Sequence, residues 1–267
     1  MGALGGWWAI LGVSTLVHAQ DVDMSWSLAI DGAPAGTREI SVRQVGPGVR
    51  VLESWTEVRA VPRRDEGGWS RFLPWRWFRS APEPQPVYQH RVTASRQGSA
   101  PPAFHSVVGG EGPRAEVQGR QIGNVWRVAI TDPDGPREGT LRADQIRFTT
   151  LDLFDPTVDW RAEVPDEGLD ASLLDVTTGV VLDGSLVPIG ASEIPVGGEA
   201  TWVEGWEWRT GAEPWRLFYA SNGFLVRFEG TFAERRVQAN LDGALPRTSD
   251  DFGVPLAPSV EVIEAMP

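Results

Sequence analysis

The sequence has 267 residues, no cysteine and no lysine, so all 24 basic residues are arginine, and the formal net charge is −12. The missing cysteines exclude disulfides, thiol catalysis and thiolate metal sites, and the missing lysines exclude Schiff-base chemistry and a P-loop lysine. The negative charge argues against nucleic acid as a partner, because phosphate binding requires a positive field.

Residues 1–19 have the pattern of a signal peptide. An apolar run covers 5–17, and Val17-His18-Ala19 fits the small-residue cleavage pattern before Gln20. The run is too short for a comfortable membrane span. No arginine precedes it, so an uncleaved anchor is the alternative interpretation. We expect an exported protein, periplasmic or secreted.

The next part of the chain alternates between apolar and polar residues, as half-buried strands do. Turn residues such as Asp31-Gly32 and Gly46-Pro47-Gly48 separate the alternating runs. Short strands with turns about every ten positions predict a sandwich or barrel rather than alternating βαβ units. The predicted strands are 24–30, 37–45, 49–61, 87–95, 103–108, 114–118, 120–131 and 137–148.

An insert at 62–86 breaks this rhythm. It contains Trp69, Trp75 and Trp77 among several arginines, and it is the only locally basic stretch of the chain. Tryptophan and arginine together suit contact with a membrane surface or with an envelope protein. The alternative is a loop folded back over an open end of the sheet.

The stretch 149–164 is irregular and acidic. Asp152, Asp155 and Asp159 could be considered for calcium, but they lack the spacing of a calcium loop, so we predict solvated turns. Asp170 could cap a short helix over 171–176, which Gly179 would end.

The strongest local signal is Asn222-Gly223 between two alternating apolar runs. This dipeptide is typical of a type I′ hairpin turn, which requires positive φ at both positions. Together with the flanking runs, the hairpin predicts a four-strand meander over 201–241. The expected cross-strand pairs are Arg216 with Glu229, Leu217 with Phe228, and Tyr219 with Val226.

The same meander predicts an aromatic face. A loop at Thr210-Gly211 would set Trp206 beside Trp215 and Trp202 beside Tyr219. Such a face must be covered, either by another layer of the protein or by a ligand. The candidate ligand-binding residues are Trp202, Glu204, Trp206, Trp208, Trp215 and Tyr219.

Catalytic signals are weak. Glu204 shares a strand face with Trp202 and Trp206, where burial would raise its pKa and make it a possible general acid of a carbohydrate-active hydrolase. Glu207 has the opposite parity and cannot complete a carboxylate pair. His90 and His105 have no metal-ligand spacing. We therefore predict no cofactor, no metal site and no catalytic residue.

The C-terminal half also resembles a known group. The residues Leu151 to Pro156, Leu174 to Gly179, Trp215 to Tyr219 and Asn222 to Val226 are similar to exported bacterial domains of unknown function with a fold like the LolA and LolB lipoprotein carriers. This resemblance covers about 145–242 and implies an incompletely closed antiparallel barrel with an apolar concave side. The insert at 62–86 departs from that pattern.

We therefore expect an all-β fold with minor helix, in which an antiparallel meander at 20–245 forms an incompletely closed barrel or curved sheet. Residues 246–267 are expected to form a flexible tail. The preferred function is a non-enzymatic domain that binds a lipid or another apolar or amphipathic ligand in the cell envelope. The alternatives are a hydrolase using Glu204 and an envelope interaction protein docking through 62–86, and a filled core would equally explain the aromatics.

Overall fold

The computed structural model describes residues 21–59, 86–111, 114–210, 213–232 and 235–245, which form a single 15-stranded sheet. Two short 3-10 helices, η3 (Ala143–Gln145) and η4 (Trp160–Glu163), accompany it. The strands are β1 (Val22–Ile30), β2 (Ala33–Gly46), β3 (Val49–Arg59), β4 (Pro86–Gln97), β5 (Ala103–Gly110), β6 (Ala115–Ile122), β7 (Val125–Asp132), β8 (Gly135–Arg142), β9 (Phe148–Thr149), β10 (Leu169–Leu174), β11 (Val181–Val196), β12 (Glu199–Arg209), β13 (Trp215–Ala220), β14 (Leu225–Phe232) and β15 (Arg235–Leu241).

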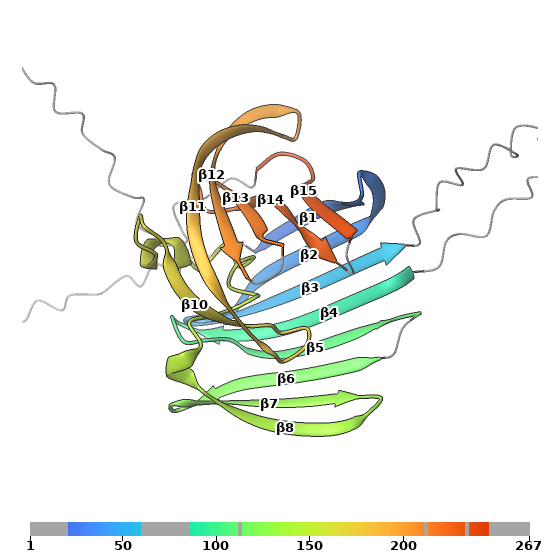
Figure 1. Ribbon diagram of the computed structural model, residues 1–267, viewed down its shortest axis with the longest axis vertical. Coiled ribbons are helices and arrows are strands. Elements are labelled where there is room, and N and C mark those ends of the chain that lie inside the picture. The colour runs from blue at the N-terminus through green and yellow to red at the C-terminus, as the bar shows by residue number, and fades with distance from the viewer. Residues whose placement is uncertain (1–20, 60–85, 112–113, 211–212, 233–234, 246–267) are drawn as a thin grey trace, which may run out of the picture.

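The sheet consists of two meanders joined by the pairing of β1 with β15 (Figure 1). Strands β1 to β8 form the first meander and β10 to β15 the second, and all pairs are antiparallel except β9 with β10. Strands β8 and β9 are the two edges of the strand order, so hydrogen bonds do not close the sheet. The prediction of an all-β, incompletely closed barrel or curved sheet is confirmed.

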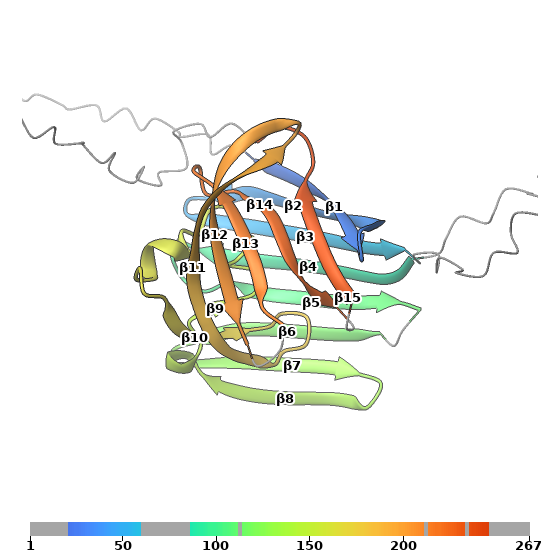
Figure 2. The same ribbon diagram turned by 45° about the horizontal axis from the view of Figure 1, so that its top comes forward.

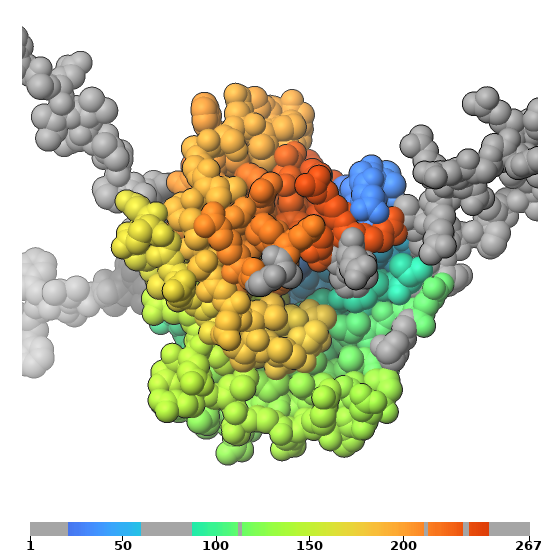
Figure 3. Space-filling view, viewed as in Figure 1, coloured from blue at the N-terminus to red at the C-terminus, as the bar shows by residue number. Residues whose placement is uncertain are grey.

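The second meander lies across the inner side of the first. Figure 2 shows β12 to β15 crossing in front of the blue and green strands, and in the space-filling view yellow and orange atoms cover much of the centre (Figure 3). The long β11–β12 hairpin curls over one end of the molecule (Figure 1). The interior is therefore enclosed between the two meanders.

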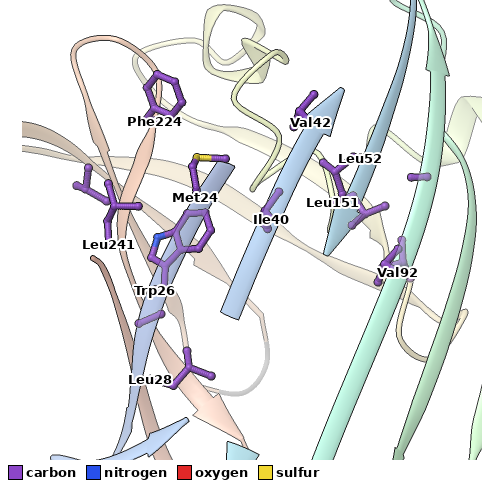
Figure 4. Close-up of a cluster of buried hydrophobic side chains, with 14 of the residues drawn as sticks. Met24, Trp26, Leu28, Ile40, Val42, Leu52, Val92, Leu151, Phe224 and Leu241 are labelled. Carbon is purple, nitrogen blue, oxygen red and sulfur yellow. The ribbon is translucent and has the colours of Figure 1, made fainter. Parts of the chain in front are cut away.

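Strict alternation explains how the strands face this interior. In β1, every second side chain from Val22 to Ile30 is buried. Figure 4 shows Met24, Trp26 and Leu28 along this strand, next to Ile40 of β2. These side chains belong to one large apolar cluster that also contains residues of β3, β4 and the second meander. Period-two burial is the physical basis on which these strands could be predicted.

Three local predictions before residue 180 are wrong. The strand expected over 137–148 ends at Arg142, where η3 follows β8. The strand expected over 120–131 is a hairpin, because Gly123 takes a φ of 58° and the chain turns between β6 and β7. The helix expected over 171–176 is strand β10 instead. Leu173 and Leu174 point to opposite sides of it and are both buried, each in a different apolar cluster. Because successive side chains are buried on opposite sides, this segment forms a strand covered on both faces rather than a helix with one apolar face.

The hairpin at Asn222-Gly223 confirms the predicted register only in part. Arg216 faces Glu229 and Leu217 faces Phe228, as expected. Near the turn the register shifts, so that Tyr219 faces Leu225 rather than Val226. Only Gly223 of the two turn residues has positive φ, and the backbone N–H of Gly223 donates to the carbonyl of Ala220. A three-residue loop with glycine at its left-handed position therefore replaces the type I′ turn.

The register between β12 and β13 also differs from the prediction. Trp208, and not Trp206, faces Trp215, while Tyr219 faces Glu204 instead of Trp202. The connection is longer than the expected Thr210-Gly211 loop, since β12 ends at Arg209 and β13 begins at Trp215. The two-residue shift keeps the parity, so the indoles of Trp206 and Trp208 still point to the same side.

Among the residues that the structure describes, no helix is long and apolar enough to cross a membrane. The expected signal peptide at 1–19 and the expected tail at 246–267 lie outside those residues.

Candidate functional site

Part of the predicted aromatic face is a filled core. Trp206, Trp208 and Tyr219 are buried, and the indole of Trp160 in η4 packs edge-on against Trp206 at 5.3 Å and against Tyr219 at 5.6 Å between ring centroids. The hydroxyl of Tyr219 donates to the carbonyl of Leu153 at 2.6 Å. We call this group of buried side chains the packed cluster. Its members are Phe148, Leu153, Trp160, Val164, Leu173, Leu186, Trp206, Trp208, Leu217, Tyr219 and Leu225.

Two of the predicted site residues lie outside the interior. Trp202 is 67% exposed, and the side chain of Glu204 is 62% exposed and lies 3.6 Å from the guanidinium of Arg161. The expected desolvation of Glu204 is therefore wrong, and with it the premise for a general acid. Glu207 lies beside Arg209 and Arg216, whose hydrogen bonds lower the pKa of its carboxyl.

An interior cavity of about 230 Å³ lies next to the packed cluster. Strands β1 to β4 form one wall, and strands β13 to β15 form the facing wall. Of the predicted aromatic face, Trp215 alone lines this cavity. The apolar side chains on its walls are Trp26, Leu28, Ile30, Val58, Leu151, Phe154, Val176, Trp215, Leu225, Phe228, Val237 and Ala239.

Residues 149–158, which we call the inner segment, run between these two walls. Leu153 contacts β13 through the hydrogen bond from Tyr219, and the ring of Phe154 lies against Phe228 of β14 at 5.8 Å. On its other side, Phe154 lies under the guanidinium of Arg38 in β2, at 3.7 Å from the ring centroid. The inner segment thus connects the two meanders and limits the cavity.

Arg96 of β4 fixes the inner segment. Its guanidinium pairs with the buried carboxylate of Asp152 and lies 3.6 Å from that of Asp155. The same carboxylates accept hydrogen bonds from the backbone N–H groups of Thr149, at 2.6 Å, and Thr157, at 2.9 Å. The prediction of solvated turns at Asp152 and Asp155 is therefore wrong. These two carboxylates hold the inner segment against β4.

A row of polar side chains crosses the β1–β4 wall. The register sets Trp26, Arg38, Thr56 and His90 side by side on four successive strands, and all four line the cavity. The indole N–H of Trp26 donates to the carbonyl of Leu225 at 3.2 Å, and Nε2 of His90 lies 2.9 Å from the hydroxyl of Ser106. Trp26 and His90 therefore have partners within the protein.

Arg38 and Thr56 have no such partners. The Nε of Arg38 and the hydroxyl of Thr56 are buried without a hydrogen-bond partner in the described part of the chain. No carboxylate of those residues lies within ion-pair distance of Arg38, whose guanidinium lies over the face of Phe154. Buried polar groups are normally satisfied. Four further side-chain atoms share this lack of a partner, in Ser54, Arg96, Trp206 and Trp208, but these residues do not line the cavity, whereas Arg38 and Thr56 do.

Burial sets the charge of the cavity walls. It lowers the pKa of His90 to about 3, with a further contribution from the positive charge of Arg38, and it raises the pKa of Tyr88 to about 12. Both groups are therefore neutral near pH 7. Burial lowers the pKa of Arg38 only to about 10, so its guanidinium stays protonated. Asp175, the remaining ionisable residue of the walls, accepts hydrogen bonds from the N–H of Thr177 and the hydroxyl of Thr178.

The parts of the chain that the structure describes contain no group of three or more side chains able to hold a metal ion. Trp69, Trp75 and Trp77, predicted as an interface, lie outside them. The insert that carries these residues joins the ends of β3 and β4, which lie next to each other in the sheet.

Sequence reasoning missed Arg38 as a site residue, although a signal was present. Arg38 has the same strand parity as Ile40 and Val42, both of which are buried, so the alternation of β2 already placed an arginine on the apolar side.

Comparison with solved structures found a β-barrel-like protein of domain of unknown function DUF1849 from Brucella abortus. The match has a TM-score of 0.55 at 11% identity and covers 83% of this chain and 95% of that protein. No family model matches the sequence, and no curated protein matches it. At this identity the likeness concerns the fold alone. The protein is a β-barrel-like domain of unknown function, and these comparisons do not extend to the LolA and LolB carriers.

Proposed function

We propose that the protein is an exported, non-enzymatic domain that binds a small apolar or amphipathic ligand in its interior cavity. The observation that carries this proposal is the cavity itself, because its walls are mostly apolar and include a few buried polar groups at defined positions. Small-molecule sites in proteins have this composition. Export rests on the apolar run and the cleavage pattern within residues 1–19.

The position of the cavity favours binding over packing. The aromatic side chains of the neighbouring packed cluster fill their space, whereas Trp215, Phe228 and Val237 leave room between the walls. Burying one apolar side chain contributes about 1.5–3 kcal/mol, and micromolar affinity corresponds to about 8 kcal/mol. A ligand in contact with several of these side chains can therefore reach micromolar affinity.

The proposal is tested with a neutral apolar fluorophore, N-phenyl-1-naphthylamine, and the purified full chain. We expect saturable enhancement of fluorescence, and mass spectrometry of an organic extract should show a copurified amphiphile. Absence of both results would contradict the proposal.

A matched pair of variants locates the binding. Ala239 lines the cavity opposite Leu28, whereas Ala29 lies on the outward side of β1, opposite Gln238. Ala239→Phe should fill the cavity and abolish the fluorescence response, and Ala29→Phe should leave it within about twofold of wild type. An equal loss in both variants would place the probe elsewhere.

A further inference from the structure

The structure points to the class of ligand. We propose that the cavity binds a small monocarboxylate with an apolar body, whose carboxylate pairs with the guanidinium of Arg38. This inference rests on the proposed function and narrows it. It is carried by the contrast between Arg38 and the ion-paired arginines elsewhere in the fold.

The other half-buried arginines of the described chain have oxygen partners, which are acidic side chains or, for Arg50, the carbonyl of Thr157. Arg43, on the outward side of the same strand, pairs with Asp21 and Asp23, and Arg96 pairs with Asp152. Arg38 has no carboxylate within ion-pair distance and makes no hydrogen bond through its side chain in the same part of the molecule. Arg38 is half-buried and its Nε is shielded from solvent. A charge partly withdrawn from water without a counter-ion is costly, so an anionic group of a ligand would complete this site.

The other ionisable groups on the walls do not supply that anion. The carboxylate of Asp175 accepts hydrogen bonds from Thr177 and Thr178, at 3.0 and 2.7 Å. The Nε2 atom of His90 lies within hydrogen-bond distance of the hydroxyl of Ser106. The positive charge of Arg38 is thus available to a ligand and would repel a cationic one.

The geometry around Arg38 favours a planar anion. Phe154 covers one face of the guanidinium at 3.7 Å, which leaves the N–H donors at its edge. A carboxylate matches that edge with two parallel hydrogen bonds. Thr56 lies directly beside Arg38 in the register, and its unpartnered hydroxyl can donate to a carboxylate oxygen. The apolar walls formed by Leu28, Val58 and Phe228 suit the rest of the molecule.

The volume limits the ligand to a single short chain or ring. Sites for drug-sized molecules measure about 300–1,000 Å³, and a water molecule occupies about 30 Å³ of liquid. The cavity of about 230 Å³ therefore suits a molecule of about ten non-hydrogen atoms. A two-chain phospholipid is far too large for it.

The test compares three probes that share one tail and differ in the head group. Octanoate, 1-octanol and octylammonium are titrated into the full chain by calorimetry at neutral pH. We expect octanoate to bind at least tenfold more tightly than octanol, because hydrogen bonds to a charged group are the strongest of their kind. Octylammonium should bind more weakly than octanol.

Variants of Arg38 test whether this residue causes the difference in affinity between octanoate and octanol. Arg38→Met should weaken octanoate binding about 10–100-fold and change octanol binding less than about threefold. Arg38→Lys should keep part of the preference for octanoate. Arg43→Met, which removes the same charge from the outward side of β2, is the matched control and should bind octanoate as wild type does.

Stability without ligand gives a second readout. Replacement of an arginine with a structural role would destabilise the fold. Replacement of a half-buried arginine that has no counter-ion should instead stabilise the fold, because its partly desolvated charge opposes folding. Arg38→Met should therefore raise the midpoint of thermal unfolding by roughly 2–4 °C while it removes octanoate binding. A lowered midpoint would contradict this assignment of Arg38.

The outcomes separate this inference from the proposed function. Equal affinity of the wild type for octanoate and octanol, or octanoate binding that survives Arg38→Met, would overturn the carboxylate inference and leave apolar binding intact. This comparison in the wild type does not depend on how any variant folds. Failure of all three probes, together with failure of N-phenyl-1-naphthylamine, would overturn the proposed function as well.

Discussion

The packed cluster and the interior cavity lie side by side on the concave surface of one sheet, yet they differ in how their space is filled. In the packed cluster, Trp160 fills the space between β12 and β13 and contacts the rings of Trp206 and Tyr219. Both regions contain buried polar atoms without a hydrogen-bond partner in the described chain, namely the indole nitrogens of Trp206 and Trp208 in the cluster and the Nε of Arg38 and the hydroxyl of Thr56 at the cavity. At the cavity there is open space beside these atoms, whereas in the cluster aromatic rings occupy it. The proposed binding therefore rests on the space next to Arg38 and Thr56, and a difference in packing between the two regions can be measured.

The largest effect should come from emptying the packed cluster. Trp160 is 1% exposed and contacts the rings of Phe148, Trp206 and Tyr219. Trp160→Ala should lower the free energy of unfolding by about 3–5 kcal/mol, as deletion of a buried aromatic ring does. Urea denaturation followed by circular dichroism measures this loss.

Trp215→Ala is the matched change on the cavity side. Trp215 is only partly buried and borders empty space, so its removal should cost about 1–2 kcal/mol. Equal losses in the two variants would show that the regions do not differ in packing.

Acid should destabilise the cavity wall through His90. Burial lowers its pKa to about 3 in the fold, against about 6.5 in the unfolded chain. A lowered pKa means that the contribution of His90 to stability is present above pH 6.5 and is lost as the pH falls towards 3. At pH 4.5 the loss should be about 2–3 kcal/mol relative to pH 7.5. Unfolding free energies at the two pH values provide the measurement.

His90→Gln isolates this effect from the titration of carboxyl groups. It should remove about 2 kcal/mol of the difference between pH 7.5 and pH 4.5. His105 lies in the neighbouring strand with an exposed side chain beside Glu116, so His105→Gln is the control. An unchanged pH profile in His90→Gln would contradict the burial of a neutral imidazole at this position.

Much of the fold could be predicted because its strands alternate and its turns carry glycine. The meander from β12 to β15 follows from local sequence, including the pairing of Arg216 with Glu229. The lengths of the loops were harder to predict from the sequence than the strands. The shift at Tyr219 depends on whether Asn222 adopts positive φ, and its chemistry permits either conformation. The shift at Trp215 follows from a connection between β12 and β13 that is longer than two residues.

The candidate site was harder to predict than the strands. Parity places Arg38 on the inner side of β2, but its isolation depends on Phe154 and on carboxylates that are distant in the sequence. Likewise, Trp206 and Trp208 were correctly expected to share a side, whereas the filling of that side depends on Trp160. Long-range packing decides which aromatic residues fill a core and which border a cavity.

Hydroxyl groups allow a finer comparison of the two regions. Tyr219→Phe removes a donor that satisfies the carbonyl of Leu153, and it should cost about 1–2 kcal/mol. Thr56→Val removes a buried hydroxyl without a partner in the described chain, and in the ligand-free protein it should be neutral or stabilising by up to about 1 kcal/mol. Thermal unfolding of both variants measures the difference. Destabilisation of similar size in both would mean that Thr56 has a partner after all.

The smallest effect on stability is expected at the end of β12 where the side chains of the predicted aromatic face are exposed to solvent. Glu204 has the same parity as Trp206, but its carboxylate is exposed and lies 3.6 Å from Arg161. Exposed ion pairs contribute about 0–1 kcal/mol, so Glu204→Gln should change the free energy of unfolding by less than about 0.5 kcal/mol and leave octanoate binding unchanged. A larger loss of stability, or a loss of binding, would mean that the interior region extends along β12 beyond Trp206. The boundary between the packed cluster and the outward surface would then have to be moved.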